Sequence, residues 1–131
     1  MNAYSEDAYI VADVGGVCGD WEAIIYRSGY VNVTESDCDT SKVTYRLYQL
    51  GKDDLKKIDR ALFEASFKSL PDNIEPQTYV TDEAVFFIRV KTPLGMKVVT
   101  AEGLDRPKDT DLVRRFQLVW DCVKSLVPND E

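Results

Sequence analysis

Pairs of nearby carboxylates are the residues of this chain whose spacing could support chemistry. The pairs are one or two positions apart and comprise Asp37 and Asp39, Asp53 and Asp54, and Asp109 and Asp111. Two close carboxylates can serve as general acid and base, or bind calcium. The spacing does not match a calcium-binding loop, and two of the pairs stand where helices are expected to begin, which favours acidic charge. We therefore expect solvated structural charges and no catalytic residue.

Other forms of site chemistry lack the residues that they need. The chain contains no histidine, which excludes Ser-His-Asp and Cys-His hydrolysis and zinc sites built on imidazole. Three cysteines are too few for a zinc site made of thiolates alone. The glycine-rich segment 15–19 has neither the spacing of a P-loop nor the dinucleotide fingerprint, so it is interpreted as a turn. The expectation is a protein that is not an enzyme, with no metal and no cofactor.

The cysteines instead suggest a covalent link. Strand-like runs over 21–26 and 30–34 surround the short loop 27–29, which is typical of a β-hairpin. If Tyr26 faces Tyr30, Cys18 lies directly opposite Cys38, whereas a two-residue loop shifts the match by one position. Either register predicts a disulfide between Cys18 and Cys38 that stabilises the fold by about 3 kcal/mol.

The elements that would position these residues follow from hydrophobic periodicity. Strands are predicted within 7–14, over the hairpin 20–35, over 42–50, and in a second hairpin formed by 84–91 and 96–100. Helices are predicted from about residue 52 to before Pro71 and from Asp109 or Thr110 to before Pro128. Because β-α-β alternation is absent, the sequence predicts an α+β fold, with an antiparallel sheet built from hairpins and two amphipathic helices on one face. One domain is expected over residues 1–131.

Three features concern partners. Tyr26 and Tyr30 either anchor a partner or simply hold the hairpin as a cross-strand pair. The net charge of −7 argues against binding nucleic acid, and it either keeps the protein in solution or attracts a basic protein partner, with Asp37 and Asp39 as candidate contacts. No apolar run approaches the length of a membrane span.

Location is inferred from the cysteines. The chain shows no signal peptide at its start, so it is either cytoplasmic with reduced thiols or the mature part of an exported protein. The predicted bridge favours a periplasmic or secreted protein. Cys122 lies in the last predicted helix, where it acts as a small buried apolar residue or, alternatively, as a reactive or intermolecular thiol.

The layout of residues 20–127 resembles that of small bacterial domains that include the emfourin-like inhibitors of metalloproteases. The resemblance lies in a hairpin before a helix led by leucine, the segment 67–71, the strand 87–90 and a closing helix. It does not extend to segment 14–18, and it transfers no inhibitory residue. It implies a non-enzymatic protein-binding domain of the inhibitor or immunity type that occludes a partner surface. The alternatives are an envelope-associated module, such as the soluble part of a lipoprotein, and an enzyme based on carboxylates.

Overall fold

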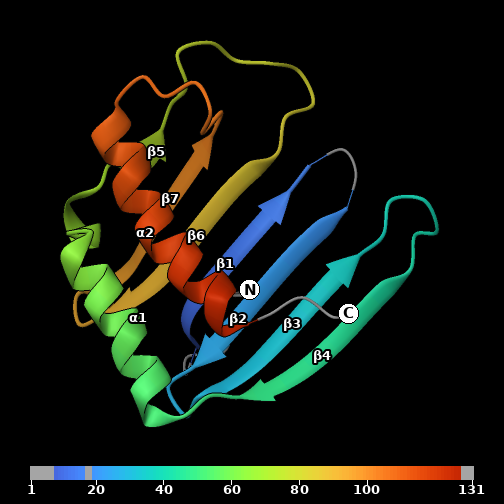
Figure 1. Ribbon diagram of the computed structural model, residues 1–131, viewed down its shortest axis with the longest axis vertical. Coiled ribbons are helices and arrows are strands. Elements are labelled where there is room, and N and C mark those ends of the chain that lie inside the picture. The colour runs from blue at the N-terminus through green and yellow to red at the C-terminus, as the bar shows by residue number, and fades with distance from the viewer. Residues whose placement is uncertain (1–7, 17–18, 128–131) are drawn as a thin grey trace.

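The computed structural model describes residues 8–16 and 19–127, which form one sheet and two main helices (Figure 1). The strands are β1 (Ala8–Gly15), β2 (Asp20–Tyr26), β3 (Tyr30–Ser36), β4 (Val43–Gln49), β5 (Asn73–Ile74), β6 (Val85–Thr92) and β7 (Gly95–Glu102). The helices are α1 (Lys52–Glu64) and α2 (Thr110–Leu126), with a short 3-10 helix, η1 (Phe67–Ser69), after α1.

The seven strands are ordered β4-β3-β2-β1-β6-β7-β5. Every neighbouring pair is antiparallel except β5 with β7, which is parallel. Both helices cover one face of this sheet (Figure 1). The predicted α+β class is confirmed. The two-residue strand β5 was not predicted, because it is very short and lies between Pro71 and Pro76.

The first hairpin has the register in which Tyr26 faces Tyr30. Trp21 pairs with Glu35 and Asp20 pairs with Ser36 along the β2–β3 ladder. Gly29 makes the turn possible, because its φ of +91° suits glycine, and a Cβ there would lie 2.4 Å from the carbonyl oxygen of Leu50. Cys18 lies outside the described residues, so its disulfide with Cys38 remains a prediction.

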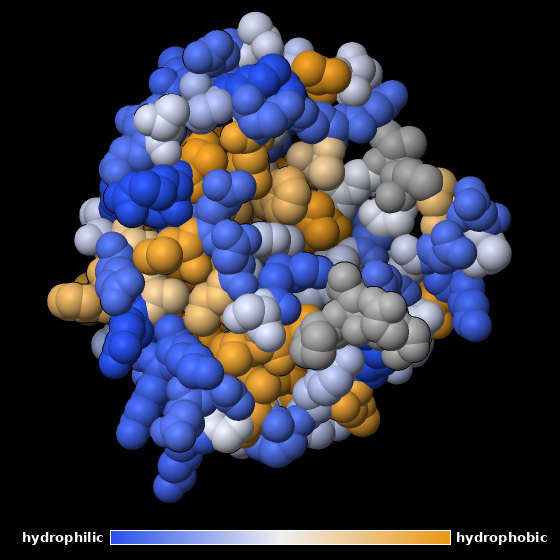
Figure 2. All heavy atoms as spheres, in the orientation of Figure 1, coloured by the Kyte–Doolittle hydropathy of each residue, from blue (hydrophilic) through white to orange (hydrophobic). Residues whose placement is uncertain are grey.

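The core lies between the sheet and the helices. Alternate residues of the central strands point towards the helices, and these are largely apolar. Trp21 and Trp120 are 5% and 8% exposed, and their ring centroids are 5.6 Å apart, so both belong to the core. Seen from the helix side, apolar side chains appear between and beside the helices, and hydrophilic ones gather on the helices' outer sides (Figure 2).

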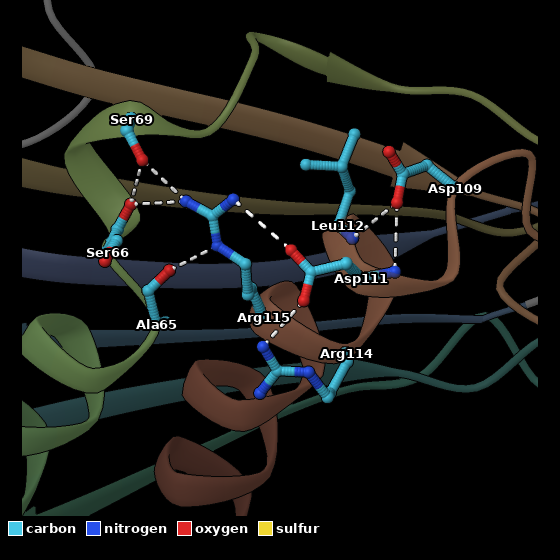
Figure 3. Close-up of polar contacts among 8 residues, drawn as sticks. All are labelled: Ala65, Ser66, Ser69, Asp109, Asp111, Leu112, Arg114 and Arg115. Atoms are coloured by element: carbon cyan, nitrogen blue, oxygen red, sulfur yellow. Dashed lines mark hydrogen bonds and ion pairs between the residues drawn. The ribbon is translucent and has the colours of Figure 1, made fainter.

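The acidic residues at the helix starts have the structural role that was expected of them. The Asp109 carboxylate caps α2 by accepting from the amides of Asp111 and Leu112 at 3.0 and 3.3 Å (Figure 3). At the start of α1, the Asp54 carboxylate accepts from the Gly51 amide at 3.1 Å. Asp54 and Asp109 therefore each have a local structural partner at the start of a helix.

Arg115 of α2 ties the two helices together (Figure 3). Its guanidinium donates to the carbonyl oxygens of Ala65 and Ser66 at 2.7 and 2.8 Å, and to Ser69 Oγ at 2.6 Å. Those carbonyls follow the end of α1, where the helix leaves acceptors without intrahelical partners. The arginine thus fixes the junction between α1 and η1.

Candidate interaction surface

The sheet face opposite the helices, here called the open face, is covered by no other element among the described residues (Figure 1). Residues paired across antiparallel strands share a face, so the register assigns each side chain to one face or the other. Ten large apolar or aromatic side chains are exposed in the described part of the chain, and six of them lie on the open face. The six are Tyr30, Val43, Tyr45, Leu47, Val85 and Met96.

Strand β4 contributes most to this exposure. The sequence divides it into an apolar face with Val43, Tyr45 and Leu47 and a second face with Thr44, Arg46 and Tyr48. The structure directs the more apolar set outward, leaving Tyr45 69% and Leu47 61% exposed. The register requires this, because Arg46 is opposite Val33, which is fully buried on the helix side. The edge strand therefore presents its apolar side to the surroundings.

Carboxylates occupy the middle of the open face. Asp13 of β1 pairs directly with Glu22 of β2. Asp20 is two residues from Glu22 and faces Gly15. A Cβ placed on Gly15 would lie 3.1 Å from Asp20 Oδ1 and 4.0 Å from Asp13 Oδ1, so both carboxylates lean over this glycine. The result is an acidic centre surrounded by exposed apolar groups.

This crowding changes the proton affinity of Asp13. Burial raises its pKa from 3.8 to about 7, helped by a hydrogen bond with Glu22 and by the negative charges of Glu22 and Asp20. Near neutral pH, Asp13 therefore carries a proton for part of the time. A cation brought to this centre would favour release of that proton, because opposite charge stabilises the ionised carboxylates.

The acidic centre lacks the surroundings expected of a catalytic or metal site. Cavities of about 530, 270, 450 and 640 Å³ are lined by residues other than Asp13 and Glu22. Within residues 8–16 and 19–127, no group of three or more Cys, Asp or Glu side chains is arranged to hold a metal ion.

The predicted tyrosine pair lies at one end of the open face. The rings of Tyr26 and Tyr30 are 6.3 Å apart at 42°, so they form the cross-strand contact that was one of the two expectations. They also border a hollow of about 640 Å³ with Asn32 and Gln49. The side-chain oxygen of Asn32 is buried and has no hydrogen-bond partner among the described residues. Holding the hairpin and receiving a partner are thus compatible roles for these tyrosines.

The predicted aspartates lie elsewhere. Asp37 follows the far end of β3, where its carboxylate accepts from the Asp39 amide at 3.2 Å and from Thr40 Oγ1 at 3.0 Å. The extended strand β3 runs from Tyr30 to the residue before Asp37, which places the two residues about 23 Å apart. The structure therefore does not bring the tyrosines and aspartates into one site, and it gives Asp37 a local role in the β3–β4 turn.

Sequence reasoning missed the acidic centre and the outward face of β4. A usable signal was the placement of Asp13 and Glu22 inside otherwise apolar strands, since an interior strand rarely carries a carboxylate without a reason. Their meeting depends on the pairing of β1 with β2, which the hairpin pattern did not reveal.

No family model matches this chain, and no curated protein matches it either. The resemblance to the emfourin-like inhibitors therefore remains a hypothesis. Among the described residues, neither helix is both long and apolar enough to cross a membrane.

Proposed function

We propose that this chain is a non-enzymatic protein-binding domain of the inhibitor or immunity type, which uses its open face to occlude a surface of a basic partner. The observation that carries the proposal is the gathering of six exposed large side chains on one sheet face around the carboxylates Asp13, Asp20 and Glu22. Exposed apolar groups supply the area that is buried on binding, and the central charges select a partner of opposite sign. The acidity of the whole chain would speed the encounter.

A matched pair of valines tests which surface is used. Val43 on the open face is 44% exposed, and Val80 in the connector before β6 is 52% exposed. The tagged protein and its V43D and V80D variants are expressed in the native cell and recovered with their partners. We expect V43D to lose the partner and V80D to keep it, since each adds the same charge at similar exposure. Circular dichroism and thermal melting establish that both variants are folded.

Retention of the same partner by folded V43D, or its equal loss from V80D, would contradict the assignment. The wild-type partner is also expected to dissociate more readily as salt is raised, because ionic screening weakens attraction between surface charges. A partner that is acidic, or whose binding is indifferent to salt, would argue against the role of the carboxylates.

We further propose that the protein works in an oxidising compartment, the periplasm or the exterior of the cell. The proposal rests on the predicted Cys18–Cys38 bridge, and the β2–β3 register that motivated that bridge is present as far as Asp20–Ser36. Mass spectrometry of protein isolated without reductant should give a mass lower by two hydrogen atoms than that of the reduced chain, and reduction should abolish the difference. Alkylation of all three cysteines before reduction would refute the Cys18–Cys38 bridge.

A further inference from the structure

A cleft of about 530 Å³ lies at the edge of the molecule, away from the open face. Its walls come from the end of α1, from η1, and from the end of β6 with the turn that follows it. These walls are mostly apolar and include Leu62, Phe63, Phe67, Val90 and Pro93. Phe63 is 83% exposed, so a molecule seated in the cleft would shield an aromatic ring that the fold leaves open. The volume is that of a small-molecule site.

The charge of the cleft is opposite to that of the chain. Two cations, Arg27 and Lys68, line it with Asp59 as the single carboxylate, and Lys91 borders it from the strand position that pairs with Met96 on the open face. That carboxylate is engaged, because it accepts a hydrogen bond from the phenol of Tyr9. Burial and Asp59 raise the pKa of Tyr9 well above its usual value, so the phenol remains a donor at working pH. The Arg27 guanidinium lies 4.0 Å from the centroid of the Tyr9 ring, which holds its charge beside the cleft.

We propose that this cleft binds a small amphiphilic carboxylate, with its apolar body against Phe63 and its carboxylate beside Lys68 and Arg27. The proposal concerns a site separate from the open face and does not depend on the protein-binding function. Apolar walls favour a molecule with a substantial hydrocarbon part, and the surplus of cations selects a negative head group. A polyanion such as a nucleotide fits less well, because the cleft offers it few polar walls.

Decanoate and decanol are suitable probes, because they share a chain and differ in the charge of the head. Decanoate is titrated into the full chain below its critical micelle concentration and decanol below its solubility limit, by calorimetry and by amide chemical shifts in NMR. We expect decanoate to bind roughly tenfold more tightly than decanol, because one hydrogen bond between charged groups contributes about that much affinity. The shifted amides should belong to η1, the end of α1 and the β6–β7 turn. Equal affinity for the two probes, shifts centred on the open face, or no binding of decanoate would overturn the proposal.

Two lysine variants separate the site from general charge. K68E alters a cleft lysine, and K56E makes the same change at an exposed position of α1 outside the cleft. We expect K68E to weaken decanoate binding by roughly tenfold and K56E to leave it nearly unchanged. The variant F63S should weaken decanoate and decanol alike. Equal losses in K68E and K56E would show that net charge, and not this cleft, attracts the anion, which would refute the site.

Discussion

The open face and the cleft expose apolar groups in opposite electrostatic settings. The open face is a broad sheet surface with Asp13 and Glu22 at its centre, whereas the cleft is a hollow lined by two cations and one carboxylate, with Lys91 at its border. A net charge of −7 therefore describes neither surface by itself. The two proposals together assign to one small acidic chain a surface for a basic protein and a separate site for an organic anion.

The two regions also depend on different parts of the fold. The open face follows from strand pairing, which fixes which side chains point away from the helices. The cleft follows from the junction of α1 with η1, which Arg115 holds through the carbonyl groups of Ala65 and Ser66. Changes at this junction should affect the cleft before they affect the open face.

The largest expected effect contrasts the two faces of the sheet. Ile88 is fully buried on the helix side, and Leu47 is 61% exposed on the open face. I88A should lower the free energy of unfolding by about 3 kcal/mol, through lost burial and a cavity. L47A should change it by less than about 0.5 kcal/mol, because little packing is removed. Urea unfolding of the two variants measures both values. Similar losses of stability would mean that Leu47 on the open face is packed against other groups, contrary to its exposure in the structure.

A second contrast sharpens the role of the helix junction. R115A removes a side chain that is 16% exposed and takes away the charged donor that serves the carbonyl oxygens of Ala65 and Ser66, so we expect the free energy of unfolding to fall by about 2 kcal/mol. R114A removes an exposed ion pair with Asp111, which contributes about 0.3 kcal/mol. Decanoate titration of R115A, at a temperature where it is folded, should also show weaker binding than R114A. Equal stability of the two variants would contradict the structural role of Arg115.

The smallest effect concerns pH and the acidic centre. The pKa of Asp13 is raised from 3.8 to about 7 in the folded chain, so between these values the folded state binds more protons than the unfolded state. The free energy of unfolding therefore falls as pH rises from about 4 to about 7. The charged neighbours on this face are Glu22 and Asp20 of β2 and Arg89 of β6.

D13N should remove this dependence and stabilise the protein by about 1 kcal/mol at pH 8, after allowance for solvent screening. The matched control D105N changes an exposed carboxylate paired with Arg106 and should retain the wild-type slope. Urea midpoints at pH 5 and pH 8 measure the difference. A wild-type slope in D13N would show that Asp13 does not carry the raised pKa.

Local patterns predicted the parts of the fold that depend on neighbours in sequence. The hairpin pattern left two registers open, and the structure has the one in which Tyr26 faces Tyr30. Asp109 was one of two candidate caps for the last helix, and the structure shows that it is the cap. The position of β1 between β2 and β6 depends on pairing between distant segments, which periodicity alone does not determine. For the same reason the meeting of Asp13 with Glu22, and the outward direction of Tyr45 and Leu47, could not be deduced before the sheet order was known.

The most direct test of the open face is site-specific photocrosslinking in the native cell. A benzophenone amino acid is placed at Tyr45 on the open face, or at Arg60, which is exposed on α1. The account predicts a defined crosslink to one basic protein from position 45, none to that protein from position 60, and its loss from position 45 when V43D is added. The same crosslink from position 60, or no crosslink from position 45 where the partner still co-purifies, would contradict the open face as the binding surface.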